Sequence, residues 1–236
     1  MSEPLVLIPD MMCDARLFAP QIVAFSRERP VHVALITGAQ TIERIAEQVL
    51  ANAPPRFALA GHCLGGIVAI EIMRRDAQRV TRLALLDTNA QSETPDAAAA
   101  REPQIVRAKA GQLEDVMRDA ILQDYLAPGP RRAEILDLII QMALDLGPEV
   151  FVRQSRALQR RPDQQKTLRK LQLPTLILCG ERDQVTPLRH HEFIADLAPN
   201  ATLQIVLNSG HLPTLEQPGL TTKLLQNWLR APLVLR

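Results

Sequence analysis

Residues 57–70 read FALAGHCLGGIVAI, and the order of residue types within this stretch decides the fold. The first four residues are apolar and predict a buried strand, GHCLGG predicts a sharp turn, and the small and aliphatic residues that follow predict a helix packed on a sheet. A turn this tight strains its central residue, so the positions two residues before and after must lack bulk; they are Gly61 and Gly65. Cys63 is therefore lifted clear of the backbone, where the helix dipole behind it favours the thiolate.

The pattern Gly-x-Cys-x-Gly resembles the nucleophile elbow of the α/β-hydrolase family, in which most members carry serine. Two later stretches resemble the same family in the required order. Residues 176–187, LILCGERDQVTP, resemble its late strand and acid loop, which places the acid at Asp183. Residues 203–211, LQIVLNSGH, resemble its last strand and base loop, which places the base at His211. The resemblance thus implies a catalytic triad of Cys63, His211 and Asp183.

A second carboxylate competes for the role of the acid. Asp87 also lies at the carboxyl end of a predicted strand, at residues 82–87, and some family members keep their acid after this strand. Asp183 is the better match because it lies in the more specific setting Gly-x-x-Asp-x-Val-x-Pro. The alternative interpretation of Asp87 is a turn or cap residue.

The resemblance also implies an oxyanion hole made of two backbone N–H groups. Met11 follows the first predicted strand, at residues 5–8, and Leu64 follows the nucleophile. The sequence departs from the family at Asp10, which stands where a glycine is common. Three neighbouring side chains are candidates for the substrate pocket: His62, Met12 and Tyr125.

Alternating strands and helices predict an α/β fold with a mainly parallel sheet and helices on both faces. The first strand begins almost at residue 1, so we expect about six strands without the family's N-terminal antiparallel hairpin. Beyond residue 89 the strand patterns stop, and amphipathic helices are predicted at 115–122, 133–146 and 149–158. We therefore expect an α/β-hydrolase core formed by residues 1–88 and 173–236. Residues 89–172 are expected to form a helical cap inserted in this core.

The composition narrows the choice of partners. A net charge of +1 gives no basic field for nucleic acid, and three cysteines without paired spacing predict neither a disulfide framework nor a metal site. No cofactor is expected. No apolar run reaches the roughly 18 residues of a membrane helix, and no signal segment is visible, so a cytoplasmic protein is expected. The oligomeric state stays open, and His190 and His191 are expected at the surface.

Together these features predict a hydrolase of a small ester, thioester or lactone. His211 would take the thiol proton, Cys63 would attack the carbonyl, and water would release the acid from a covalent acyl-enzyme. A thioester also passes its acyl group to amines or thiols, so an acyltransferase is an alternative. Two further alternatives are a serine hydrolase studied as a Ser-to-Cys variant and a non-catalytic, ligand-binding member of the fold.

Overall fold

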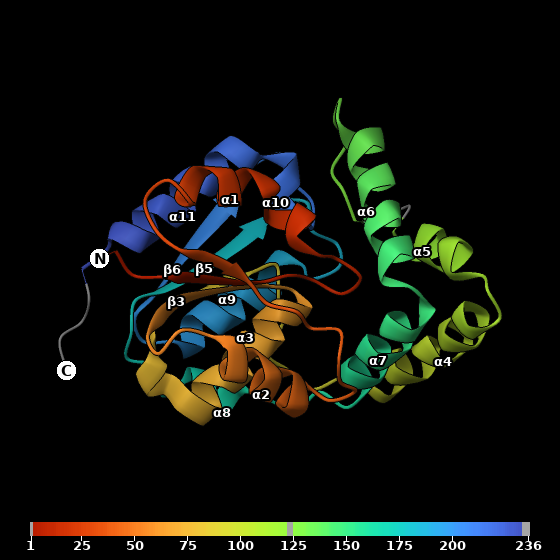
Figure 1. Ribbon diagram of the computed structural model, residues 1–236, viewed down its shortest axis with the longest axis horizontal. Helices are drawn as coiled ribbons and strands as arrows, with labels where there is room; N and C mark the ends of the chain where they lie inside the picture. Colours follow the sequence, from red (N-terminus) through yellow and green to blue (C-terminus); the bar gives the residue numbers. More distant parts are fainter. Residues whose placement is uncertain (1, 122–124, 233–236) are drawn as a thin grey trace.

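The computed structural model of the protein describes residues 2–121 and 125–232 (Figure 1). Its sheet has six strands: β1 (Leu5–Ile8), β2 (Val31–Val33), β3 (Phe57–His62), β4 (Val80–Leu86), β5 (Thr175–Gly180) and β6 (Ala201–Val206). They pair in the order β2-β1-β3-β4-β5-β6, and every pairing is parallel. The expected six-stranded parallel sheet is confirmed. Because all strands run the same way, the loops after their carboxyl ends gather at one edge.

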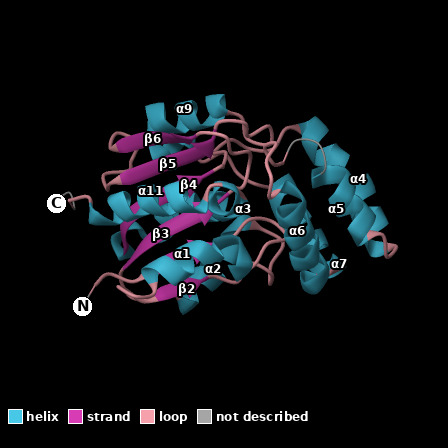
Figure 2. Ribbon diagram, turned by 90° about the horizontal axis from the view of Figure 1, so that it is seen from above, coloured by secondary structure: helices cyan, strands magenta, loops and turns pink. Residues whose placement is uncertain are grey.

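Helices cover both faces of the sheet, as predicted (Figures 1 and 2). One face carries η1 (Ala15–Phe18), α1 (Ala19–Phe25), α10 (Pro213–Glu216) and α11 (Pro218–Arg230). The other face carries α2 (Ile42–Asn52), α3 (Leu64–Asp76), η2 (Ala77–Arg79), α8 (Gln165–Leu168) and α9 (Leu188–Leu197). Side chains alternate along β1: Leu5 and Leu7 pack in the first apolar cluster, Val6 and Ile8 in the second. A strand covered on both faces must be apolar throughout, which is why these strands read as unbroken hydrophobic runs.

Four further helices form a layer beyond one end of the sheet (Figure 2). They are α4 (Pro95–Lys109), α5 (Leu113–Ile121), α6 (Arg132–Leu146) and α7 (Pro148–Gln159). The last three match the predicted helices within a few residues, although residue 122 lies outside the described part of the chain. Helix α4 was not predicted, because Pro103 interrupts its sequence and few apolar residues recur at helical spacing. The division into a core and a cap at residues 89 and 172 stays a prediction.

The helical layer meets the sheet at the edge where the strands end. Gln154 of α7 accepts a hydrogen bond of 2.8 Å from the N–H of Met12, just after β1. The layer therefore lies over the loops in which the candidate site residues were predicted. Within residues 2–121 and 125–232, none of the helices has the length and apolar character needed to cross a membrane.

Candidate active site

Cys63 lies between β3 and α3 with backbone angles of φ 45° and ψ −106°, which a non-glycine residue rarely adopts. The glycines on either side are required by close packing. A Cβ atom on Gly61 would lie 2.2 Å from the carbonyl oxygen of Gly65, and one on Gly65 would lie 2.2 Å from that of Ile8. The turn therefore has the geometry that residues 57–70 predict, and it lifts the thiol clear of the backbone at the carboxyl edge of the sheet.

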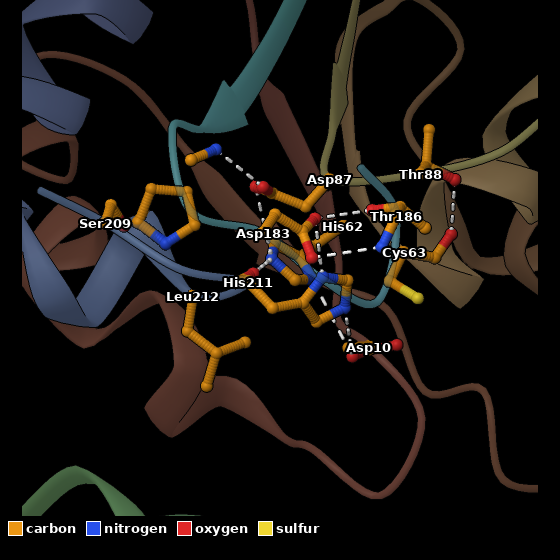
Figure 3. Close-up of polar contacts among 12 residues, drawn as sticks. Asp10, His62, Cys63, Asp87, Thr88, Asp183, Thr186, Ser209, His211 and Leu212 are labelled. Atoms are coloured by element: carbon orange, nitrogen blue, oxygen red, sulfur yellow. Dashed lines mark hydrogen bonds and ion pairs between the residues drawn. The ribbon is translucent and has the colours of Figure 1, made fainter. Parts of the chain in front are cut away.

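The predicted base and acid are paired. Nδ1 of His211 lies 2.9 Å from Oδ2 of Asp183, and both side chains are buried (Figure 3). The other carboxylate oxygen, Oδ1, accepts hydrogen bonds from the N–H groups of Val185 (2.8 Å) and Thr186 (3.0 Å). Burial alone would raise the pKa of Asp183, but the charge of His211 and these hydrogen bonds hold it below its usual range. Asp183 is thus a fixed anion that orients the imidazole.

Asp87, the competing acid, lies in a different environment. Its Oδ1 accepts a hydrogen bond of 2.8 Å from the N–H of Gly180, and its Oδ2 lies 3.6 Å from Nε2 of His62. Burial and the neighbouring charge of Asp183 raise the pKa of Asp87 well above its usual value, which favours the neutral carboxylic acid. Of the two candidates, Asp183 has the geometry and the charge to support His211.

Both predicted oxyanion donors point at a single atom, and that atom belongs to the protein. The N–H groups of Met11 and Leu64 lie 2.5 Å and 3.2 Å from Oδ1 of Asp10. The second oxygen, Oδ2, accepts a hydrogen bond of 2.6 Å from the Tyr125 hydroxyl and lies 3.5 Å from Nε2 of His211 (Figure 3). The side chain of Asp10 therefore occupies the place that the sequence predicts for a substrate oxyanion.

The charge on Asp10 changes the expected chemistry of the thiol. Burial alone would raise the pKa of Asp10, but hydrogen bonds and positive charge from His211 keep it below its usual range. The sequence favours a thiolate at Cys63 because a helix begins behind it. That expectation is wrong for this conformation, since burial and the Asp10 carboxylate raise the pKa of Cys63 to about 12. The anion held at the start of α3 offsets the helix dipole.

The three candidate pocket residues all lie at this edge of the sheet. His62 is buried, and its Nε2 lies 2.7 Å from the carbonyl oxygen of His211. Met12 is also buried, with its N–H bonded to Gln154. Tyr125 is half-buried, packs edge-on against the His211 ring at 4.6 Å between centroids, and accepts a hydrogen bond of 2.7 Å from the His211 N–H. Their role toward a substrate stays a prediction.

Sequence reasoning missed Glu216, which organises the loop that carries His211. Its carboxylate accepts hydrogen bonds from the N–H groups of Gly210 (2.9 Å) and Leu212 (2.9 Å), one on each side of the histidine. It also accepts a bond of 2.8 Å from the N–H of Ala127, on the way from α5 to α6. A glutamate five residues after a predicted catalytic histidine was the available signal.

The expectation for His191 is wrong. This residue is buried, and its Nε2 accepts a hydrogen bond of 3.0 Å from the N–H of Thr88, beyond the end of β4. Adjacent helical residues point to different faces. Because α9 packs on the sheet, His191 faces the sheet while His190 does not. His191 therefore supports the loop that holds Asp87.

Burial differs among the residues of this group. Cys63 is partly exposed as a residue, whereas the side chains of Asp10, His62 and His211 have no exposed surface. A surface cavity of about 590 Å³ lies elsewhere, between β2 and α2, where His32 and Gln48 contribute to its wall.

A strained elbow with a nucleophile, a carboxylate–histidine pair and two converging N–H groups at the end of a parallel sheet define the α/β hydrolases. The chain belongs to the alpha/beta hydrolase family, whose sequence profile matches residues 9–223. It is an enzyme, a hydrolase of this fold.

Its relatives include two enzymes named pimeloyl-(acyl-carrier protein) methyl ester esterase. The one from Aromatoleum aromaticum is 26% identical over 212 residues, which cover 85% of each chain. The one from Vibrio atlanticus is 23% identical over 232 residues, covering 89% of this chain and 87% of the other. Both comparisons span most of the fold at low identity.

Solved structures agree with this assignment. A thermophilic esterase from Thermogutta terrifontis superposes with a TM-score of 0.88 at 26% identity, over 98% of this chain and 90% of the other. An enol-lactonase from Burkholderia xenovorans superposes with a TM-score of 0.85 over 98% and 92% of the two chains. At 20% identity, the second likeness shows the fold alone.

Proposed function

We propose that the protein hydrolyses small carboxylic esters, thioesters or lactones, with Cys63 as nucleophile, His211 as base and Asp183 as the acid that orients the base. The observation that carries this proposal is the 2.9 Å contact between His211 and Asp183 beside a partly exposed thiol in a strained elbow. Relatives named as esterases, at low identity over most of the chain, support the choice of ester-type substrates.

The reaction begins with proton transfer from the Cys63 thiol to Nε2 of His211. The sulfur attacks the carbonyl carbon, and the tetrahedral intermediate collapses to a thioester as the alcohol leaves with the proton from His211. Water then gives a proton to His211 and attacks the thioester, which releases the acid and restores the thiol. Asp183 holds Nδ1–H throughout and stabilises the imidazolium that forms at each step.

The carbonyl oxygen can reach its two donors only after Asp10 has left them. In the reactive complex it takes the place of Asp10 Oδ1 between the N–H groups of Met11 and Leu64. One such donor typically contributes about 3–4 kcal/mol to the stabilisation of the transition state. Displacement of the carboxylate also removes a negative charge from beside the thiol, which then ionises more easily.

The helices α4–α7 serve in this proposal as a cap that shapes the pocket. They cover the carboxyl edge of the sheet. Gln154 of α7 contacts Met12, and Tyr125, in the connection between α5 and α6, contacts Asp10. A cover of this kind excludes water and strengthens electrostatic interactions within the site. The acyl group of the substrate would lie between this layer and Cys63.

A set of cysteine variants tests the proposal. Cys63→Ala should abolish hydrolysis of a panel of short acyl esters, acyl thioesters and lactones. The control is Cys179→Ala, which alters a buried cysteine in β5 and should retain the parental rate. Hydrolysis by Cys63→Ala at the parental rate would overturn the assignment. Addition of an amine or thiol acceptor separates hydrolysis from acyl transfer, since turnover that depends on the acceptor identifies a transferase.

A further inference from the structure

Three side chains meet in a buried space next to the thiol. Oδ2 of Asp10 lies 3.5 Å from Nε2 of His211 and 3.9 Å from Nδ1 of His62. A ligating atom from each of the three lies within 4.8 Å of those from the other two, and none of these side chains has exposed surface (Figure 3). The cluster therefore brings one carboxylate oxygen and two imidazole nitrogens to a single point.

The tautomers of both histidines are set by their other ring nitrogens. Nε2 of His62 faces the carbonyl oxygen of His211 at 2.7 Å, and a carbonyl oxygen only accepts, so the hydrogen lies on Nε2. Nδ1 of His211 faces the Asp183 carboxylate at 2.9 Å and carries the hydrogen for the same reason. In the neutral rings, the nitrogens turned toward Asp10 therefore present lone pairs.

With both rings neutral, as metal binding requires, two imidazole lone pairs and a carboxylate oxygen face one another, and a cation between them is favourable. Within the described residues, neither Nδ1 of His62 nor Nε2 of His211 has a hydrogen-bond partner. A proton on His211 would relieve one contact and leave His62 unsatisfied. A single cation shared by all three atoms would satisfy the whole cluster.

We propose that Asp10, His62 and His211 form a binding site for a divalent transition-metal ion of the zinc type. Tetrahedral zinc with bonds to nitrogen and oxygen of about 2.0–2.1 Å separates its ligand atoms by about 3.3 Å. The separations of 3.5 Å and 3.9 Å from Asp10 Oδ2 are within a few tenths of an ångström of this value, and the two imidazole nitrogens lie within 4.8 Å of each other. Two imidazoles and one carboxylate leave a fourth position open.

The surroundings of the three ligands are those that metal-binding side chains require. Metal-ligating histidines donate their other ring N–H to a carboxylate or a carbonyl, as His211 and His62 do here. The Asp10 carboxylate is likewise fixed, because Oδ1 accepts the N–H groups of Met11 and Leu64. These contacts orient the ligands before the ion arrives.

The two departures from the family pattern both add a ligand at this point. Asp10 replaces the common glycine of the oxyanion loop, and Cys63 replaces the common serine of the elbow. The side chain of Cys63 lies next to Asp10 and His211 in Figure 3. It can fill the fourth position as a thiolate, with release of its proton to solvent, which completes a set of two imidazoles, one carboxylate and one sulfur.

Occupation of the site would switch off the esterase, a consequence that rests on the proposed function. The ion takes the lone pair of His211 that should accept the thiol proton, and it holds Asp10 in the oxyanion hole. Metal binding and ester hydrolysis therefore exclude each other. Figure 3 shows Asp10 beside His62 and His211, which is the arrangement that the proposed ion requires.

The test is titration of the full chain, freed of metal by a chelator, with zinc chloride in a calorimeter. One ion per chain is expected, and titration with cobalt should produce the visible absorption bands of a tetrahedral ion. His62→Gln retains a donor toward the His211 carbonyl but removes a ligand, and it should weaken zinc binding at least about 100-fold. His191→Gln changes the other buried histidine, which lies with Asp87 and Asp183 in a second acidic cluster, and it should bind as the parent does.

Three results would overturn the proposal: absence of stoichiometric binding by the parent, unchanged affinity in His62→Gln, or loss of affinity only in His191→Gln. Circular dichroism of each variant excludes loss of the fold as the cause. The two proposals fail separately. A protein that binds zinc but hydrolyses no ester refutes the proposed function alone, and an active esterase that binds no zinc refutes the metal site alone.

Discussion

Replacement of Asp10 with glycine should make the protein a faster esterase. The carboxylate now occupies the two N–H groups that a substrate oxygen needs, and each hydrogen bond to a charged group contributes about 1.5–3 kcal/mol. Withdrawal of Asp10 from both donors therefore costs about 3–6 kcal/mol before any substrate can bind productively. Glycine removes this cost, which corresponds to an increase in kcat/KM of about 10²- to 10⁴-fold.

Asp10→Asn is the matched intermediate. Its amide oxygen can still accept from Met11 and Leu64, but a bond between neutral groups contributes only about 0.5–1.5 kcal/mol. The kcat/KM of Asp10→Asn should therefore lie between those of the parent and of Asp10→Gly. The assay is hydrolysis of a short acyl p-nitrophenyl ester in the presence of a chelator, which removes any bound metal from the comparison.

A second measurement follows the thiol itself. The Asp10 carboxylate contributes to the raised pKa of Cys63, so its removal should shift the pH dependence of Cys63 alkylation by iodoacetamide to lower pH. If Asp10→Gly keeps its fold and hydrolyses the ester more slowly than the parent, Asp10 assists the reaction and the argument fails.

Other parts of the site make separate predictions. Asp183→Asn should lower kcat/KM by about 10⁴-fold, because an amide no longer fixes the His211 tautomer, whereas Asp87→Asn should have a far smaller effect; equal losses would contradict the assignment of the acid. The kcat/KM of the parent should rise with pH above neutrality, since His211 accepts a proton only when it is neutral. Burial lowers the pKa of His211, but Asp183 and Cys63 raise it well above 6.5. A pH–rate profile that falls over this range would refute that account. Gly65→Ala should lower the free energy of unfolding by more than about 4 kcal/mol, as its Cβ would lie 2.2 Å from the Ile8 carbonyl oxygen. Gly129→Ala, whose Cβ would have no described atom within 4 Å, is the control, and a similar Tm for both variants would show that the elbow tolerates the methyl group.

The sequence was sufficient for the sheet because its signals are local. An unbroken apolar run such as β3 indicates a strand covered on both faces, and Gly61 and Gly65 indicate the turn that follows. The pairing of Asp183 with His211 could be expected from the resemblance, since parallel strands bring the loops after β5 and β6 to one edge. Local patterns of this kind also predicted three of the four helices that cover the site.

What the sequence could not predict depends on contacts between distant residues. The Asp10 side chain turns into the oxyanion hole because the N–H of Leu64, 54 residues later, lies within its reach. The pKa of Cys63 is then raised by burial and by Asp10, and neither of these causes is visible in the local sequence. The burial of His191 likewise depends on how α9 packs, and periodicity alone did not choose between it and His190.

Two hydrogen bonds join residues 125–127, which lie between α5 and α6, to the loop that carries His211. The His211 N–H donates to the Tyr125 carbonyl, and Glu216, which holds the residues on either side of His211, also accepts from Ala127. A displacement of residues 125–127 would break both bonds, so the placement of the proposed base depends on a segment that lies outside the sheet.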